Sequence, residues 1–482
     1  MTLIVVSNRV VRPRADAPID GGLAAALLPA VSLSGAIWVG SSGRTRSHLP
    51  SEKEGFAQVE ALGAGAVATV DFPADHYRGY YEGFANSGLW PVLHSRTDLI
   101  RATEEDYHSY RAINTFMAKA LLRFARSDAL FWIHDYHFMG LGAELRRHGI
   151  RRPIGFFLHT PFPARNVLLS LPHHRDLISA MLSYDFIGFQ TDEDRDNFAD
   201  YAQHELHQRM VGDSVMTAHG PTKLASCPIG IDAKAFSERA TRAATRPEVS
   251  RLRTSLQGGK LVIGVDRLDY SKGLAHRFRA FDRMLQIEPE LKRAVSLLQI
   301  AVPSRGQIDC YRRLQDEIAA LVGEISGRHG EVDWTPIRYL NKGFAQSILA
   351  GFYRTARVGL VTPLHDGMNL VAKEYVAAQN PLDPGVLVLS QFAGAARQLE
   401  AALLVNPHDV DALARTIALA LAMSGDERRE RWAAMMRELE ASSLERWFAD
   451  FVKTLRGCEC LPVESPRRAM LSRQIDGTAQ SY

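Results

Sequence analysis

Short apolar runs followed by segments of helical periodicity recur along the whole chain. β-branched and apolar runs such as Leu3–Ser7, Ala129–Ile133 and Leu261–Val265 predict buried strands. After each run come polar turn residues and then apolar positions at helical spacing. This repeated strand–helix order is typical of an α/β protein built on parallel sheets.

The strand–helix series occurs twice, which predicts two domains. In the first series Pro228–Asp232 is interpreted as the last element, and the polar stretch 233–257 as the boundary. A chain of 482 residues is also too long for one hydrophobic core. The expected division is residues 1–235 for an N-terminal Rossmann-like domain, 236–443 for a C-terminal one, 444–456 for an amphipathic helix that packs back on the first domain, and 457–482 for a disordered polar tail.

Two open α/β domains of similar size leave a cleft between them. Ligands of such sheets bind outside the carboxyl ends of the strands. We therefore expect the functional residues in the loops that follow the strands.

Composition and charge narrow the class of protein. The content of 46% hydrophobic and 23% charged residues is ordinary for a soluble globular protein. A net charge of +3 is too small to indicate nucleic-acid binding, so any anion site must use local arginines and lysines. Met1–Arg9 is interpreted as a strand rather than a signal peptide, and no apolar run reaches membrane-spanning length. Four cysteines without a CxxC pair suit a reducing compartment, so we expect a cytoplasmic protein without a membrane partner.

Val361–Glu374 is the most informative stretch, because a strand, a tight turn and a new helix follow one another in it. The free N–H groups of a helix N-terminus attract anions such as phosphate. Asp366 in the turn is suited to accept hydrogen bonds from sugar hydroxyls, and Glu374 to hold a ribose diol. Taken alone, the pattern fits an ordinary turn with a capping aspartate equally well.

Asp135 and His159 each end a predicted parallel strand, so their side chains should enter the same crevice. The alternative is a solvated loop aspartate and a hydrogen-bonded histidine. His134 and His137 lack a clear third ligand, which argues against a metal site.

Basic residues occupy equivalent positions after strands in both halves. Arg267 and Lys272, in the loop Gly264–Gly273, are placed to clamp a diphosphate. Arg9 and Arg305 follow strands of the two halves and are candidate phosphate anchors across the cleft. No nucleotide-hydrolase P-loop motif is present.

An acidic run at Asp192–Asp196 contains a DxD pattern of the kind that holds metal ions in some sugar transferases. It lies in the first turn of a predicted helix, where acidic residues favour the helix dipole. Thr191 as N-cap and Asp194 at N3 also predict a variant of the capping box. We interpret the acidic run as structural. The sequence thus predicts two clusters of basic residues that bind anions, acids and a histidine that bind hydroxyl groups, and no metal site. This combination is typical of a nucleotide-sugar transferase with a phosphorylated acceptor.

At these residues the chain resembles the trehalose-6-phosphate synthases, retaining glucosyltransferases with the GT-B fold of two Rossmann-like domains. The likeness runs from Leu3 to about Leu455 in the same order. The motifs that carry it are Val6-Ser-Asn-Arg9, Gly21-Gly-Leu-Ala24, Trp132-Ile-His-Asp-Tyr-His137, Phe157-Leu-His-Thr-Pro-Phe-Pro163, Asp266-Arg-Leu-Asp-Tyr-Ser-Lys-Gly273, Pro303-Ser-Arg-Gly306 and Asp366-Gly-Met-Asn-Leu-Val-Ala-Lys-Glu374.

The resemblance implies transfer of glucose from UDP-glucose to glucose 6-phosphate, giving α,α-trehalose 6-phosphate, with no cofactor and no metal. It implies front-face substitution with retention, in which the leaving diphosphate takes the acceptor's proton. The implied catalytic residues are Asp135, His159, Arg267, Lys272 and Asp366. The implied donor-binding residues are Gly21, Gly22, His159, Arg267, Lys272, Phe344, Asp366, Gly367, Met368, Asn369, Leu370 and Glu374. The implied acceptor-binding residues are Arg9, Tyr81, Trp90, Asp135 and Arg305.

Three positions differ from the family pattern. Ser41 and Ser95 stand where a tryptophan and a tyrosine are usual, and His365 replaces a frequent arginine. The two serines predict a larger or wetter acceptor pocket. A transferase of the same family with another acceptor, such as glycerol 3-phosphate, and a pseudo-glycosidic coupling enzyme therefore remain alternatives.

Two further classes are weighed against these. A sugar-phosphate sensor would not need the donor residues that the chain retains. A pyridoxal-phosphate phosphorylase would share the architecture, but Lys373 alone is not a sufficient sign of it. The expected partners are small-molecule substrates and, in a homo-oligomer, further copies of the chain.

Overall fold

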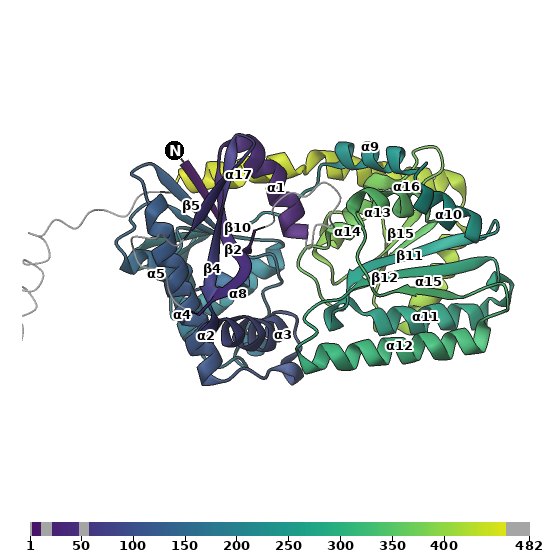
Figure 1. Cartoon of the computed structure of the whole chain (residues 1–482), viewed down its shortest axis with the longest axis horizontal. Helices are drawn as coiled ribbons and strands as arrows, with labels where there is room; N and C mark the ends of the chain where they lie inside the picture. The colour runs from purple at the N-terminus through teal and green to yellow at the C-terminus, as the bar shows by residue number, and fades with distance from the viewer. Residues whose placement is uncertain (1, 11–21, 48–56, 459–482) are drawn as a thin grey trace, which may run out of the picture.

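The computed structural model describes residues 2–10, 22–47 and 57–458, and the strands of these residues form two sheets (Figure 1). The order in the first sheet is β3-β4-β2-β1-β5-β6-β7-β10-β9-β8, and in the second β13-β12-β11-β14-β15-β16. The described pairings of the second sheet are all parallel. In the first sheet only the two ends are antiparallel, at β3–β4 and at β8–β9–β10. The predicted α/β class with two parallel-sheet domains is confirmed.

The strands have the following bounds. Those of the first sheet are β1 (Thr2–Arg9), β2 (Ile37–Arg46), β3 (Gln58–Leu62), β4 (Gly65–Pro73), β5 (Ala129–His134), β6 (Ile154–Phe157), β7 (Phe186–Phe189), β8 (Arg209–Val211), β9 (Ser214–Thr217) and β10 (Gly220–Ser226). Those of the second are β11 (Lys260–Arg267), β12 (Val295–Val302), β13 (Ile337–Leu340), β14 (Val358–Val361), β15 (Val386–Ser390) and β16 (Leu403–Val405).

Helices cover both sheets. In the first half they are α1 (Gly22–Ser34), α2 (Ala74–Arg78), the π-helix η1 (Gly79–Leu89), α3 (Trp90–Leu93), α4 (Glu104–Leu121), α5 (Leu141–Arg147), α6 (Arg165–Leu168), α7 (His174–Met181) and α8 (Asp192–His204). In the second they are α9 (Ala233–Ala243), α10 (Pro247–Ser255), α11 (Leu274–Ile287), α12 (Asp309–His329), α13 (Gln346–Thr355), α14 (Leu370–Ala378), α15 (Val410–Ala422), α16 (Gly425–Ala441) and α17 (Leu444–Arg456). Short 3₁₀ turns are η2 (Thr97–Leu99), η3 (Leu122–Phe124), η4 (Tyr136–Phe138), η5 (Tyr270–Lys272), η6 (Pro289–Leu291) and η7 (Gly394–Arg397).

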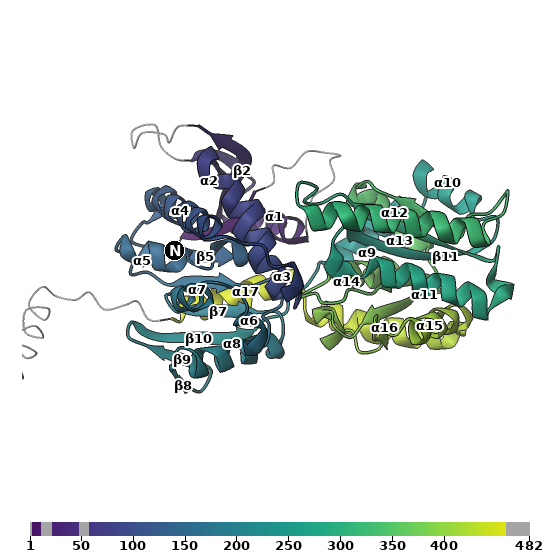
Figure 2. The ribbon, with the colours of Figure 1, turned by 90° about the horizontal axis from the view of Figure 1, so that it is seen from below.

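The two sheets form two lobes that lie side by side in both views (Figures 1 and 2). In the second lobe, α9, α13, α14 and α16 cover one face of the sheet, and α11, α12 and α15 cover the other (Figure 1). The central strands are apolar and buried on both faces. In β14, for example, every residue of Val358–Val361 is buried. This is the pattern that a parallel sheet between two helical layers requires.

The segment between the sheets corrects one prediction. Pro228–Asp232, interpreted as the last element of the first half, is a connection without helix or strand. Its path is fixed by close packing, because a Cβ on Gly230 would lie 2.0 Å from the carbonyl oxygen of Ser442. The polar stretch 233–257, predicted as the domain boundary, contains the helices α9 and α10. Both helices bury an apolar stripe, which includes Phe236 and Val249. Their exposed faces are polar, so the stretch as a whole has a polar composition.

Helix α17 returns to the first sheet (Figure 1). The ring of Phe451 stacks on Trp132 of β5, with centroids 4.2 Å apart. Gly155 and Gly188 leave the space for this helix, since a Cβ on either would lie 2.9 Å from the Phe451 ring. Trp447 also donates a hydrogen bond from Nε1 to the carbonyl oxygen of Cys227, at 3.1 Å. The end of the described chain is therefore attached to the N-terminal lobe.

Across the described ranges, none of the helices has both the length and the apolar character needed to cross a bilayer. The predicted donor residue Gly21 and the tail 459–482 lie outside the described residues.

Candidate active site

The predicted site residues meet where the carboxyl ends of the two sheets face each other. Asp135 and His159 follow β5 and β6, whereas Arg267 ends β11 and Arg305 follows β12. Gly367, after β14, packs so closely on the other lobe that a Cβ would lie 2.3 Å from the His159 carbonyl oxygen. The site is therefore shared between the two lobes.

Arg305 is the centre of a buried cluster that joins the lobes. Its guanidinium donates from NH1 to Asp269 at 2.9 Å and to the Tyr311 hydroxyl at 2.6 Å, and from NH2 to the Tyr136 hydroxyl at 3.1 Å. It also lies over the ring of Trp90, 3.9 Å from the centroid. Its Nε is buried and has no hydrogen-bond partner among the described residues. One donor of a firmly held cation therefore remains for a ligand.

Asp269 is the anion that holds this cluster, and sequence reasoning missed its role. Its carboxylate is fully buried and accepts from Arg305, the Tyr311 hydroxyl and the Ser271 amide. Burial by itself would raise its pKa, but the charges of Arg305, Arg267 and Lys272 hold the pKa well below the usual range. The carboxylate is therefore ionised and fixes the orientation of Arg305.

Asp269→Asn should weaken acceptor binding. Arg305 would keep a hydrogen bond but lose the charge that orients it, which is worth about 1.5–3 kcal/mol. Steady-state kinetics should show the KM for the phosphorylated acceptor raised roughly tenfold or more, with a much smaller change in donor KM. Asp98→Asn removes an exposed aspartate of an Arg–Asp pair and is the matched control. Equal increases in both KM values would contradict a role in orienting Arg305.

Arg267 is the least engaged cation of the site. Its guanidinium lies over the ring of Trp90, 5.2 Å from the centroid. It forms no hydrogen bond or ion pair with the residues described by the structure. A half-buried arginine without an acidic partner at the end of a strand is available for an anionic ligand.

Lys272 and Asp366, predicted as separate donor contacts, are bonded to each other. The Nζ–Oδ2 distance is 2.6 Å, and Asn369 donates to the same oxygen at 2.9 Å. Burial would raise the pKa of Asp366, but the ammonium of Lys272 keeps it below its ordinary value. Asn369 also caps helix α14, since its Oδ1 accepts from the Ala372 amide. This helix N-terminus, with Met368 and Leu370 beside Asn369, supplies backbone N–H groups for an anion.

Asp135 lies in a strained backbone conformation. Its φ of 73° and ψ of 166° belong to a region that is essentially restricted to glycine. The conformation directs Oδ1 to the His159 amide, at 3.3 Å. Burial raises its pKa to about 6, although Arg267 and Arg305 act in the opposite direction. Such strain at the edge of a cleft marks a side chain that is held for a ligand.

The His159 imidazole is enclosed by protein partners. Its Nε2 is 3.0 Å from His134 Nδ1, and its Nδ1 is 3.2 Å from the side-chain amide of Gln190. Burial lowers its pKa to about 3, so the ring is neutral. Because both ring nitrogens already have partners, a sugar hydroxyl must replace one of these contacts or use the backbone.

The remaining predicted donor residues come from both lobes. Glu374, in α14, accepts a hydrogen bond from Gln346 at 2.9 Å, and burial raises its pKa to about 7. Phe344 lies in the loop before α13, its ring 5.4 Å from that of Phe352. Gly22 is the first residue of α1.

Most of the predicted acceptor residues lie in the N-terminal lobe. Tyr81, in η1, stacks on His137 with ring centroids 5.9 Å apart. The exposed guanidinium of Arg9 covers Gly43, whose Cβ would lie 2.9 Å from it. Arg305 is the acceptor candidate that the C-terminal lobe supplies, so both lobes contribute to the acceptor set.

Comparison with known proteins settles the family. The model for glycosyltransferase family 20 matches residues 14–457. The chain is 43% identical to the trehalose-6-phosphate synthase of Sinorhizobium fredii over 456 residues, covering 94% of this chain and 98% of that one. The chain belongs to glycosyltransferase family 20.

Solved structures agree with this family assignment. An α,α-trehalose-phosphate synthase (UDP-forming) from Burkholderia xenovorans, in complex with glucose-6-phosphate, has a TM-score of 0.91 and 42% identity, with 95% of this chain and 100% of that chain covered. An E. coli structure bound with UDP-2-fluoro glucose has a TM-score of 0.88 and 37% identity, with 95% and 99% covered. The predicted family and the GT-B fold are confirmed.

Ser41 and Ser95, the two serines that differ from the family pattern, lie in different parts of the site. Ser41 is buried, and its Oγ accepts a hydrogen bond from the Gly43 amide beside Arg9. Ser95 lies across the cleft from His365, with Oγ 3.4 Å from Nδ1. Ser95 and His365 both line a cavity of about 210 Å³ that also contacts Asp366 and Gly367. The Ser95 substitution therefore affects the wall next to the Asp366 loop, and Ser41 the wall next to Arg9.

Other acidic and histidine candidates have structural partners. Asp194 accepts from the Phe162 amide and forms the predicted capping box with Thr191, which makes it part of the α8 N-terminus. Within residues 2–10, 22–47 and 57–458, no group of three His, Cys, Asp or Glu side chains is arranged to hold a metal ion.

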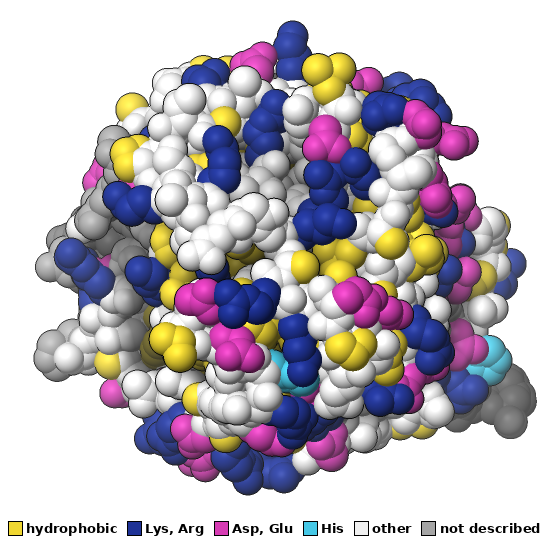
Figure 3. Space-filling model, turned by 90° about the vertical axis from the view of Figure 1, so that its right-hand side faces the viewer, with side chains coloured by type: hydrophobic (Ala, Val, Ile, Leu, Met, Phe, Trp, Pro, Cys, Tyr) yellow, Lys and Arg dark blue, Asp and Glu magenta, His cyan; other side chains and the backbone are white. Residues whose placement is uncertain are grey.

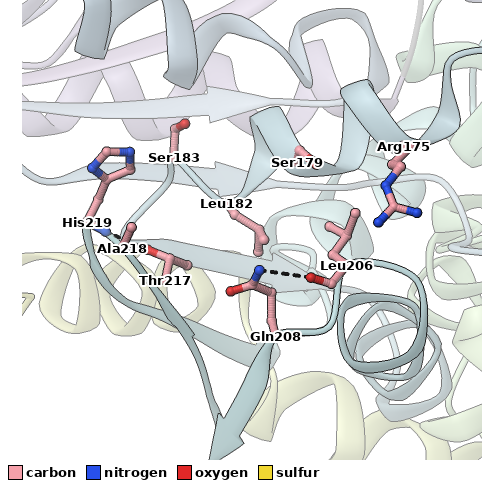
Figure 4. Close-up of a pocket in the computed structure, with 9 residues that line it drawn as sticks. All are labelled: Arg175, Ser179, Leu182, Ser183, Leu206, Gln208, Thr217, Ala218 and His219. Carbon is pink, nitrogen blue, oxygen red and sulfur yellow. Dashed lines mark hydrogen bonds between the residues drawn. The ribbon is translucent and has the colours of Figure 1, made fainter. Parts of the chain in front are cut away.

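A separate hollow of about 290 Å³ lies on the N-terminal lobe, away from these residues (Figure 4). Its lining includes Arg175 of α7, Gln208 before β8 and His219 of the β9–β10 turn. It contains none of the predicted site residues.

Proposed function

We propose that this chain is a trehalose-6-phosphate synthase, which transfers glucose from UDP-glucose to glucose 6-phosphate with retention. The observation that carries the proposal is the position of two cations beside the ring of Trp90. The Arg267 guanidinium has no hydrogen-bonded or ion-paired partner among the described residues, and Arg305 is held by Asp269 with a free Nε. A diphosphate at Arg267 and an acceptor phosphate at Arg305 would bring the two substrates together in the cleft. The relatives bound with glucose-6-phosphate and with UDP-2-fluoro glucose support this assignment.

In this reaction the protein acts mainly by position and charge. Arg267, Lys272 and the N-terminus of α14 would hold the donor diphosphate and stabilise the charge that develops on it. The leaving oxygen can take the proton of the acceptor hydroxyl on the same face of the sugar, so no protein nucleophile is required. Asp366 and the His159 region would hold the glucose, and Glu374 the ribose. Arg9, Tyr81 and Arg305 would hold the acceptor, with Asp135 next to the reacting hydroxyls.

The choice of acceptor depends on the wall around Arg9, where Ser41 stands in place of an aromatic residue. Its hydroxyl is already used by the Gly43 amide, which keeps the local backbone in place. We therefore favour glucose 6-phosphate over a smaller acceptor such as glycerol 3-phosphate.

Release of UDP from UDP-glucose with a panel of phosphorylated acceptors tests the function directly. Glucose 6-phosphate should give UDP release and a non-reducing disaccharide phosphate, whereas glycerol 3-phosphate and free glucose should give kcat/KM values lower by a factor of about 100, as expected when a phosphate or ring contact is lost. Faster UDP release with glycerol 3-phosphate than with glucose 6-phosphate would make glycerol 3-phosphate the acceptor. No release with any acceptor would exclude both.

We also propose the domain division at about residue 235, a cytoplasmic location and, where the protein assembles, a homo-oligomer. The packing of α9 and α10 in the second half and of α17 on the first supports this division. Limited proteolysis would locate the domain boundary, and sedimentation would measure the oligomeric state.

A further inference from the structure

A second cationic hollow lies at the far end of the C-terminal lobe, opposite the cleft. Its volume is about 440 Å³. It lies where β11, β14 and β15 begin, because Gly259, Thr355 and Asp383 in its wall each come shortly before one of these strands. The complete lining is Ala244, Arg253, Leu256, Gly258, Gly259, Gly351, Arg354, Thr355, Asn380 and Asp383. Figure 3 shows this end of the molecule, with Lys and Arg side chains grouped around a depression.

The two arginines in the wall have no acidic partner among the described residues. Arg354 donates from NH1 to the carbonyl oxygens of Ala378 and Gln379, at 3.1 and 3.2 Å. Arg253 donates from NH2 to the Ala244 carbonyl oxygen, at 3.1 Å. Burial lowers the pKa of Arg354, as expected for a guanidinium without a neighbouring anion. Each arginine thus keeps N–H donors that no described residue uses.

The single acidic side chain in the wall is already neutralised. Asp383 pairs with Arg357 at 2.9 Å and with Arg428 at 2.6 Å. The wall and its immediate neighbours therefore carry four arginines against one aspartate. Asn380 adds an amide group, whose oxygen accepts from the Leu382 N–H. The local field favours an anion, and it is separate from the cations of the cleft.

We propose that this hollow binds a phosphate group, either as free phosphate or as a small phosphate ester. Guanidinium groups bind phosphate through paired N–H donors, and two of them on one wall match the oxygens of a single phosphate. The volume lies in the range of small-molecule sites and leaves room for a sugar-sized substituent next to Asn380 and Thr355. No aromatic side chain lines the described wall, so a nucleotide base would find no stacking surface there.

Equilibrium dialysis with radiolabelled inorganic phosphate tests the site. The experiment uses the Arg305→Gln protein, which lacks the acceptor-phosphate anchor, in excess UDP, which fills the proposed diphosphate site at Arg267 and Lys272. Saturable phosphate binding that remains should then come from the second hollow. Adding Arg253→Gln and Arg354→Gln together should weaken this binding at least tenfold. Adding Arg242→Gln instead, which removes an exposed arginine of α9 outside the hollow, should leave it unchanged.

Competition with glucose 6-phosphate and glycerol 3-phosphate separates the two sources of phosphate. If either ester binds more tightly than inorganic phosphate, the ligand is a phosphorylated metabolite. If both esters bind as tightly as inorganic phosphate or more weakly, the ligand is free phosphate. Absence of saturable phosphate binding in the Arg305→Gln protein, or binding that survives loss of Arg253 and Arg354, overturns the proposal. If a variant does not fold, Arg253→Gln alone in the otherwise unchanged chain should lower the number of bound phosphates, and an unchanged number would also overturn it.

Discussion

Replacing Arg267 by alanine should lower kcat/KM by roughly 10²–10³-fold, the loss found when one preorganised donor to a developing negative charge is removed. Arg267 is suited to this role because its guanidinium forms no hydrogen bond or ion pair with the described residues and therefore need not break one to bind the donor. Its interaction strengthens as charge moves to the leaving diphosphate, so kcat should fall as well as kcat/KM. Initial rates of UDP release over a range of donor concentrations measure both.

Arg267→Lys is the informative companion variant. It keeps the charge but loses the planar fork, so its activity should lie between those of the wild type and Arg267→Ala. Arg279→Ala, at an exposed position of α11, controls for a general loss of positive charge. Near-normal kcat/KM in Arg267→Ala would exclude Arg267 from the donor site.

Replacing Arg277 by leucine should lower the free energy of unfolding by about 3–5 kcal/mol, the effect of leaving a buried ion without its partner. The Arg277 side chain is fully buried beneath the loop that carries Arg267 and Lys272. It pairs with Asp266 at 2.5 Å and donates to the side chains of Gln299 and Thr362. Urea denaturation should therefore show a large shift of the midpoint.

Two variants identify the cause of that loss. Arg279→Leu, two residues along the same helix, breaks a surface pair with Glu317 and should cost at most about 1 kcal/mol. Adding Asp266→Asn to Arg277→Leu removes the uncompensated charge and should restore part of the stability. If the double variant were as unstable as Arg277→Leu, lost packing rather than an unpaired charge would be responsible.

Some elements were predictable because their signals are local. The β-branched run before Asp366 and the helical pattern after the turn indicate a strand and a helix within a few residues of each other, and the structure contains β14 and α14 there. The Thr191–Asp194 capping box was predicted for the same reason and is present. Family membership followed from motifs that extend over most of the chain, and the comparisons confirm it.

Other features depend on contacts between distant segments. The π-helix η1 and the strand β4 have no distinctive local pattern and were not predicted. Pro228–Asp232 was wrongly interpreted as a regular element, because its apolar residues pack in a connection without helix or strand. The role of Asp269 was not evident either, since it arises from partners in three separate loops.

The sequence by itself determined the alternation of strands and helices, the two-sheet architecture and the positions after strands where cations and acids occur, because these depend on the periodicity and chemistry of neighbouring residues. Only the tertiary structure decided which of these charges are paired. It joined Lys272 to Asp366 and Arg305 to Asp269, and it left Arg267 without a described partner. The reason is that the pairing of a charge depends on distances between loops that lie far apart in the sequence, which no local pattern contains.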